Sequence, residues 1–256
     1  MIYSVKEKNF IEKQYAREVW LSKRGIGGSD VGALMQVSKW QTFNDVFNRL
    51  LGKAKDKDDL AKKNKRVAEG QKAEKYIWNL YAIEHPDKKV VTAAINKVWL
   101  FFSNKNVRIT VTPDALVQIG SGDDKEYTEG VEIKDVEVHS KKELEKWQTG
   151  NIPEQYFYQV MQYMVVINTL KKVTLVARIK VMKEKELDHI EEYYYEYSRK
   201  EWKDTIKFVG WLENEFIERY VNKNKRPNAN YLEELKKEYE TRNRASRRNK
   251  DTSSDN

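Results

Sequence analysis

The 256-residue sequence predicts one α/β domain in which helices flank a central mixed β-sheet. Helical hydrophobic spacing prevails up to about residue 84, and short β-rich runs follow as far as residue 138. Helical patterns return from residue 153, with a further strand pattern between them. Because helix and strand patterns are grouped and do not alternate regularly, we do not expect a doubly wound parallel sheet.

The N-terminal part of the sequence is predicted to be helical. The run 43–50 carries apolar residues at i, i+3, i+4 and i+7, the spacing of one helix face. Ser29 or Asp30 can cap a short helix after a glycine-rich turn. The segment 53–66 holds seven basic and three acidic residues and is expected to be a solvated loop or helix surface. The predicted helices are 4–22, 29–35, 42–52 and 67–84.

The hydrophobic period then changes to that of strands. Short apolar, β-branched runs are separated by turn residues, and Gly120–Asp124 has the composition of a loop tip. Such short, closely spaced runs indicate a mostly antiparallel block. The predicted strands are 90–91, 98–102, 107–111, 115–119 and 130–138.

The C-terminal half returns to mostly helical patterns. Pro153 is favoured in the first turn of a helix, which we expect to run to about Leu170. The segment 187–197 is ambiguous, and we interpret it as a strand. The other predicted elements are a strand over 173–181 and helices over 199–221 and 229–240. We assign 1–225 to one domain and 226–256 to a charged extension, whose tail from residue 242 is predicted to be disordered.

The composition limits the class of function. The chain has 48 basic and 40 acidic residues, a net charge of +8, which favours a polyanionic partner such as nucleic acid. It has no cysteine, so disulfides, zinc–cysteine sites and iron–sulfur clusters are excluded. No run approaches the ~20 apolar residues of a membrane span, and the N-terminus lacks a signal-peptide pattern. We therefore expect a soluble protein of the cytoplasm with no membrane partner.

Two carboxylates and a lysine are predicted to meet on neighbouring strands. Asp114 follows a proline before one apolar run, and Glu132 and Lys134 lie on one face of the next. Hard oxygen ligands suit magnesium, and a lysine beside them can act on an attacking water. The set is typical of a magnesium-dependent phosphodiester nuclease. A hairpin with solvent-facing charges is the alternative, and this motif alone does not decide between them.

Other residues form possible extensions of that site. Glu74 on the preceding helix is the favoured third carboxylate, with Glu69 as the alternative. Arg24 with the turn Gly27–Ser29 forms either a phosphate cradle or a simple helix start with glycines chosen for positive φ.

A row of glutamines marks the helix that begins at Pro153. Gln155, Gln159 and Gln162 share one helical face at i, i+4 and i+7. This face either contacts the DNA backbone or a metal-bound water, or is a polar outer stripe.

These motifs in this order resemble the YqaJ-like viral recombinase family, the lambda-exonuclease-type nucleases of the PD-(D/E)XK superfamily. The matching pieces are Trp20 with Arg24–Asp30, Glu69–Glu74, Pro113–Leu116, Glu132–Lys134 and Tyr158–Tyr163. The resemblance implies a restriction-endonuclease-like core over about 20–180, with extra N- and C-terminal helices. It also implies a magnesium-dependent 5′→3′ exonuclease that digests one strand of linear double-stranded DNA and leaves a 3′ overhang for recombination by strand annealing.

The resemblance further implies the roles of single residues. Asp114, Glu132 and the backbone carbonyl of Ile133 would hold magnesium, for which manganese can substitute, and Glu74 would contribute to a second ion. Lys134 would act on the water.

The remaining implied roles concern the DNA end. Gln159 would help Lys134, Arg24 and Ser29 would grip the 5′-phosphate of the duplex, and Thr112 would lie nearby. The family also implies a homotrimeric ring, a single-strand annealing protein as partner and, for a phage protein, the cytoplasm of a bacterial host.

Two features depart from the family pattern. Asp135 follows the lysine where small or apolar residues are usual, and the last 35 or so residues have no counterpart. Two other functions stay open at this point. One is a different DNA nuclease on the same core, such as an endonuclease or resolvase, and the other is a non-catalytic DNA-binding module.

Overall fold

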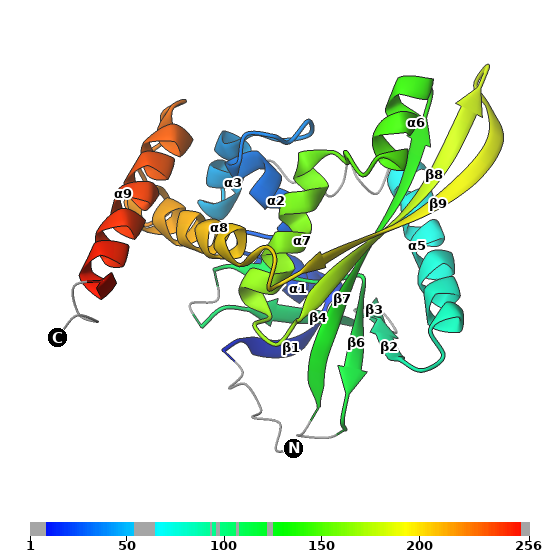
Figure 1. The fold of residues 1–256 in the computed structure, drawn as a ribbon, viewed down its shortest axis with the longest axis horizontal. Helices are drawn as coiled ribbons and strands as arrows, with labels where there is room; N and C mark the ends of the chain where they lie inside the picture. The colour runs from blue at the N-terminus through cyan, green and yellow to red at the C-terminus, as the bar shows by residue number, and fades with distance from the viewer. Residues whose placement is uncertain are drawn as a thin grey trace.

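The computed structural model describes residues 9–53, 65–92, 94–95, 98–105, 108–121 and 125–251. Most of the predicted lysine-rich loop and the end of the predicted Gly120–Asp124 tip lie outside these residues. Two sheets and the helices that cover them form the molecule (Figure 1). Within the described part of the chain, no helix is both long and apolar enough to span a lipid bilayer.

The larger sheet has five strands and is mixed. Its strands, in spatial order, are β2 (Lys89–Thr92), β6 (Ala115–Ile119), β7 (Glu126–Val138), β8 (Lys172–Lys183) and β9 (Glu186–Ser198). Only the central β7–β8 pair is parallel, and the other neighbours are antiparallel. The predicted α/β fold with a central mixed sheet is confirmed, as is the strand interpretation of 187–197.

The second sheet contains a strand that we predicted to be helical. β4 (Val98–Ser103) pairs with β3 (Ala94–Ile95), β5 (Thr110–Val111) and β1 (Ile11–Ala16). The predicted 4–22 helix is therefore wrong over β1, and of the part of this span that the structure describes, from residue 9 on, only α1 (Arg17–Lys23) is helical. Antiparallel pairing of all six β1 residues with β4 supplies backbone hydrogen bonds that local helical propensity cannot offset.

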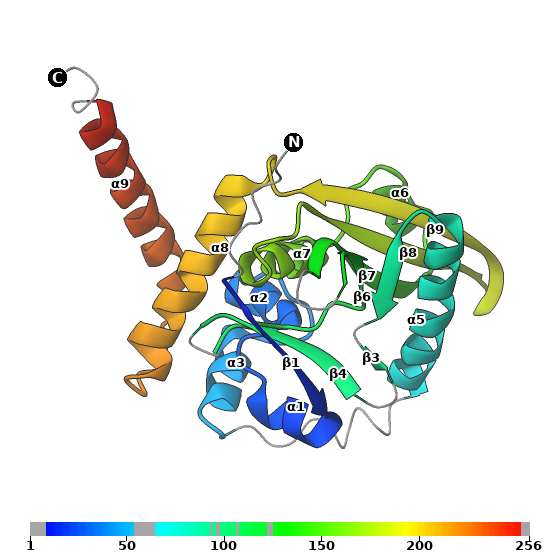
Figure 2. The same cartoon turned by 90° about the horizontal axis from the view of Figure 1, so that it is seen from below.

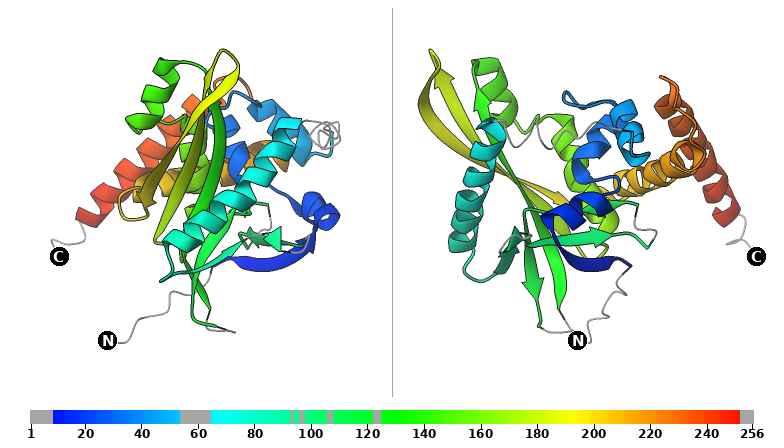
Figure 3. Two further views of the ribbon diagram at one scale, coloured as in Figure 1. Left: turned by 90° about the vertical axis from the view of Figure 1, so that its right-hand side faces the viewer. Right: turned by 180° about the vertical axis from the view of Figure 1, so that it is seen from behind.

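Helices cover both faces of the larger sheet. On one face lies α5 (Lys65–Glu84), which packs Ile77 and Tyr81 against Val131 and Ile133 of the sheet. The other face is covered by α7 (Glu154–Val166), behind which lie α2 (Gly28–Leu34) and α8 (Lys203–Phe216) (Figure 3). β7 is therefore sandwiched between two layers of helix, and its alternate side chains face different helices.

The remaining helices complete the main core. Thr42 caps the N-terminus of α3 (Phe43–Leu50), and a short π-helical turn (Ile217–Val221) continues α8. α6 (Lys141–Gln148) lies in a segment for which we predicted no element.

The last helix is longer than predicted. α9 spans Tyr231–Asp251, so the disorder predicted from residue 242 is wrong for the helical part of the tail. Pairs at i, i+4 such as Glu238–Arg242 and Glu240–Arg244 support the helix there. Tyr231 at its start is fully buried in the main core, while its end leads away from the body (Figure 2).

Candidate active site

β6 and β7 bring the predicted carboxylates and lysine together. Asp114 immediately precedes β6, and its Oδ2 accepts a hydrogen bond of 2.7 Å from the backbone N–H of Ile133 on β7. Glu132 and Lys134 project from the opposite side of β7 to Ile133, and the Lys134 ammonium donates to the Glu132 carboxylate. The solvent-facing hairpin is excluded for Glu132, which is only 1% exposed.

Two side chains from α7 complete the surroundings of Glu132. The Gln159 amide donates to Glu132 Oε1 at 2.5 Å, and the Tyr163 hydroxyl donates to Glu132 Oε2. Burial, followed by the charge of Asp114, raises the pKa of Glu132 to about 7 despite these donors. Burial alone would lower the pKa of Lys134, but the charges of Glu132 and Asp114 outweigh it and raise that pKa to about 12. Lys134 is therefore an ammonium at neutral pH, suited to orienting a water and offsetting developing negative charge.

Asp114 and Glu74 form a second pair of carboxyl groups at this centre. Burial, and next the neighbouring Glu74, raises the pKa of Asp114 well above its usual range. The pKa of Glu74 is also raised, mainly by burial, with the charge of Glu132 adding to the effect. The predicted helix carboxylate thus lies at the site, whereas the side chain of its alternative, Glu69, is outside the described part of the structure.

The chemistry of this cluster fits a hard divalent cation. Like-charged carboxyls in contact repel each other, and a bound cation relieves that repulsion. Across the described residues, however, no three His, Cys, Asp or Glu side chains are already arranged around one ion position. The oxygens of Glu132 are instead occupied by its three donors.

Asp135 does not add its charge to this centre. Its side chain faces the opposite side of β7 from Lys134, where Lys180 of β8 contacts it at 2.8 Å and Arg178 at 3.6 Å. Its charge is thus balanced within the sheet, and the departure from the family pattern leaves the surroundings of Lys134 intact.

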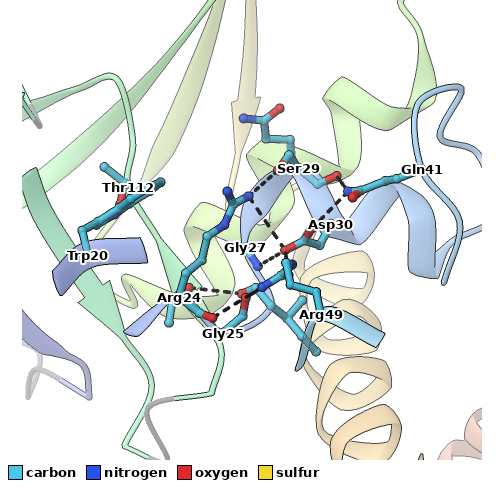
Figure 4. A network of polar contacts seen from close by, with 12 residues as sticks. Trp20, Arg24, Gly25, Gly27, Ser29, Asp30, Gln41, Arg49 and Thr112 are labelled. Carbon is cyan, nitrogen blue, oxygen red and sulfur yellow. Dashed lines mark hydrogen bonds and ion pairs between the residues drawn. The ribbon is translucent and has the colours of Figure 1, made fainter. Parts of the chain in front are cut away.

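A polar pocket of about 120 Å³ lies beside the carboxylate centre. Arg24, directly after α1, and Ser29, in the first turn of α2, line it together with Gln159 and Tyr163 from α7, and we call the segment between them the Arg24–Ser29 loop. The Arg24 Nη2 donates to Ser29 Oγ at 2.8 Å, and its guanidinium lies over the Trp20 ring (Figure 4). The other lining residues are Trp20, Gly27, Gly28, Thr110, Val111 and Thr112. Gln159 and Tyr163 therefore belong to the pocket and to the shell of Glu132 at once.

The Arg24–Ser29 loop is fixed by residues that close-pack on its glycines. None of Gly25, Gly27 and Gly28 has a positive φ, so the interpretation that they were chosen for such angles is wrong. A Cβ on Gly28 would lie 3.0 Å from Gln159 Cγ and 3.1 Å from a Tyr163 ring carbon. The glycine thus lets the loop approach α7, and this approach joins the pocket to the carboxylate centre.

A model of the YqaJ-like viral recombinase domain matches residues 19–171, which contain both the pocket and the carboxylate centre. The chain belongs to this family. The resemblance inferred from the motifs is therefore confirmed.

The fold is also similar to that of solved structures. Two crystal structures of the alkaline exonuclease LHK-Exo from Laribacter hongkongensis are similar, one of them in complex with dAMP. They are 17% and 16% identical, with TM-scores of 0.49 and 0.47, and the alignments cover 90% and 88% of this chain and 98% of each of those chains. No curated protein sequence matches the chain.

For one predicted site residue, Gln162, the structure contradicts the prediction that it contacts DNA. Gln162 is fully buried and lies near Glu213 of α8, so its side chain has no access to DNA. Gln155 is also largely buried and accepts a hydrogen bond from the Lys39 N–H at 3.0 Å. The glutamine row faces the neighbouring helices and β7, so the predictions of a DNA contact and of a polar outer stripe are wrong for Gln162.

Two residues at the site were not predicted. The sequence assigned no site role to Tyr163, although its i+4 spacing from Gln159 places it on the same helix face. Arg49 of α3 contacts the Arg24–Ser29 loop, and no local pattern marks it, because its partners are 19 to 25 residues away in sequence.

Proposed function

We propose that the protein is a magnesium-dependent 5′→3′ exonuclease that digests one strand of linear double-stranded DNA. The observation that carries this proposal is the shared wall of pocket and carboxylate centre. Gln159 and Tyr163 line the pocket of Arg24 and Ser29 and donate hydrogen bonds to Glu132. A terminal phosphate in the pocket would lie next to the groups that act on a phosphodiester.

The carboxylate centre supplies candidate ligands for the metal. Asp114, Glu132, Glu74 and the backbone carbonyl of Ile133 are the proposed donors, and their raised pKa values reflect charge that a cation would balance. A bound magnesium ion would supply Lewis acidity toward the phosphodiester and a more acidic water. Manganese, another ion suited to oxygen ligands, is expected to substitute.

The remaining roles in catalysis and in binding of the DNA end are proposed for side chains of the protein. The Lys134 ammonium would orient the attacking water and offset negative charge at the reacting phosphate, while the Gln159 amide holds Glu132 in place. Arg24 and the Ser29 hydroxyl would bind the 5′-phosphate. Thr112 accepts a hydrogen bond of 2.9 Å from the Trp20 ring nitrogen and would fix that wall of the pocket.

The assembly and partner are proposed from the family resemblance. They are a homotrimeric ring around DNA and a single-strand annealing protein that receives the 3′ overhang in the cytoplasm of a bacterial host. Light scattering of the purified protein tests the ring, with three times the 30.4 kDa chain mass as the expected result.

The decisive test of activity compares linear and covalently closed circular duplex of the same sequence, with magnesium or with EDTA. We expect magnesium-dependent loss of the linear form only. Cleavage of the closed circle would identify an endonuclease on the same core. An intact linear duplex, with Lys134→Ala behaving as the wild type, would identify a non-catalytic DNA-binding module.

A further inference from the structure

A buried carboxylate lies directly behind the proposed phosphate pocket. The Asp30 side chain is 2% exposed, whereas the side chains of its two neighbouring arginines, Arg24 and Arg49, are 29% and 30% exposed. Asp30 also accepts hydrogen bonds from the Gly27 N–H at 2.7 Å and from the Gln41 amide at 3.0 Å. A buried carboxylate of this kind needs a cationic partner.

The two arginines do not share Asp30 equally (Figure 4). Arg49 Nη2 lies 2.5 Å from Asp30 Oδ2, but Arg24 Nη2 lies 3.9 Å from the same oxygen. Arg49 Nη1 also donates to the backbone carbonyl of Gly25 at 3.1 Å. One guanidinium therefore neutralises the carboxylate and holds the loop, and the other is left to face Ser29 and the pocket.

We propose that Arg49 is a positioning residue for recognition of the DNA end, because it occupies Asp30 and so keeps Arg24 available for a 5′-phosphate. The inference rests on the proposed function of the pocket. Among the described residues, Arg24 is the other cation within ion-pair distance of the buried Asp30. Closing the 3.9 Å separation to a direct ion pair would draw the Arg24 guanidinium away from Ser29 and from the phosphate.

The planar fork of arginine matters less than its charge in this role. Lysine at position 49 would still neutralise Asp30 but would not bridge it to the Gly25 carbonyl. Asparagine at position 30 would keep one acceptor oxygen for the Gly27 N–H while removing the charge that attracts Arg24. These two changes separate neutralisation of the carboxylate from general support of the loop.

The experiment measures the ratio of digestion rates on 5′-phosphorylated and 5′-hydroxyl linear duplexes. We compare wild type with Arg49→Met, Asp30→Asn, the double variant, Arg49→Lys and Arg24→Ala, and follow the melting temperature of each. Arg219→Met is the matched control, because Arg219 is also a partly exposed arginine that joins two carboxylates, Glu215 and Glu238, and it does not line the pocket.

We expect Arg49→Met to lower the ratio about 10-fold, toward that of Arg24→Ala, which corresponds to one charge-assisted hydrogen bond. Adding Asp30→Asn should restore most of the ratio, because Arg24 is no longer drawn away. Arg49→Lys, Asp30→Asn alone and Arg219→Met should keep a ratio near that of wild type.

Several results would overturn the inference. If Arg49→Met keeps the wild-type ratio of rates, the two arginines do not compete for Asp30. The same conclusion follows if the ratio of the double variant is as low as that of Arg49→Met. If Arg49→Met does not fold, the ratio of rates for Asp30→Asn tests the inference instead. A ratio for Asp30→Asn as low as that of Arg24→Ala contradicts it. A wild-type enzyme that digests both ends equally instead refutes the phosphate pocket of the proposed function, and the role of Arg49 fails with it.

Discussion

The carboxylates around Lys134 and the arginines around Asp30 are neighbouring charge clusters that differ in how their charges are balanced. Asp30 has a close arginine, a backbone donor and an amide donor, so its cluster is satisfied by the protein alone. Asp114 and Glu74 lie together, and burial is the main cause that raises both pKa values, to which the charge of Glu74 adds for Asp114 and the charge of Glu132 adds for Glu74. The difference distinguishes a pocket whose charges the protein itself balances from a centre whose carboxyl groups suit a cation.

Of the variants that test this difference between the two clusters, Lys134→Ala should have the largest effect on activity. We expect digestion of linear duplex to fall at least about 100-fold, because the variant loses the only ammonium bonded to Glu132 among the described residues. Gel assays at saturating DNA measure the rate. Lys180→Ala is the control, since Lys180 is equally buried and pairs with Asp135 on the other face of the sheet. Equal losses in both variants would contradict a special role for Lys134.

Gly28→Ala should disturb the link between the two clusters. The added methyl group meets Gln159 and Tyr163 at 3.0 and 3.1 Å, so we expect about 10-fold slower digestion as both side chains are displaced. Gly210→Ala is matched to it, because its methyl group would meet Val165 of α7 at 3.1 Å, away from the site. If the two variants lose the same small amount of activity, the link has no functional role.

Asp114→Asn should separate stability from activity. In EDTA, loss of the like charge beside Glu74 is expected to raise the free energy of unfolding by about 1 kcal/mol. Magnesium should raise the melting temperature of wild type and leave the inactive variant unchanged. Asp204→Asn, on an exposed carboxylate of α8, should respond to magnesium as wild type does. An unchanged magnesium shift in Asp114→Asn would remove Asp114 from the metal site.

Glu213→Gln should have the smallest effect. Burial, opposed by the Gln162 amide, raises the pKa of Glu213 well above its usual value. The folded state therefore keeps its proton as the unfolded chain loses it, and stability falls as pH rises above about 4.5. Glutamine removes that loss, so the variant should gain about 1 kcal/mol at pH 8 and little at pH 4. Urea unfolding at both pH values tests this, and equal changes would contradict it.

The sequence predicted those parts of the fold and site that depend on the local spacing of apolar and polar residues. The alternation of β7 put Glu132 and Lys134 on one face, and Pro113 marked the start of the run beside Asp114. The same reasoning failed where the conformation or contact of a residue depends on a partner that is distant in the sequence. β1 pairs with β4 about 85 residues later, and Arg49 meets Asp30 through the packing of α3 on the loop.

The glutamine helix shows the same limit from another side. Its spacing correctly placed Gln155, Gln159 and Gln162 on one face of α7, but spacing does not tell which way a face points. The structure turns that face toward α2, β7 and α8, so Gln159 reaches Glu132 while Gln162 is buried. Polarity alone suggested solvent, DNA or a metal-bound water for all three.

The most direct test of the link between the two clusters uses a duplex with a 5′-phosphate at one end and a 5′-hydroxyl at the other, with a different fluorophore on each strand. With magnesium, we expect the phosphorylated strand to shorten first from its 5′ end, and Arg24→Ala to shorten both strands at one slow rate. Equal shortening of both strands by the wild type, or loss of nucleotides from 3′ ends, would contradict it.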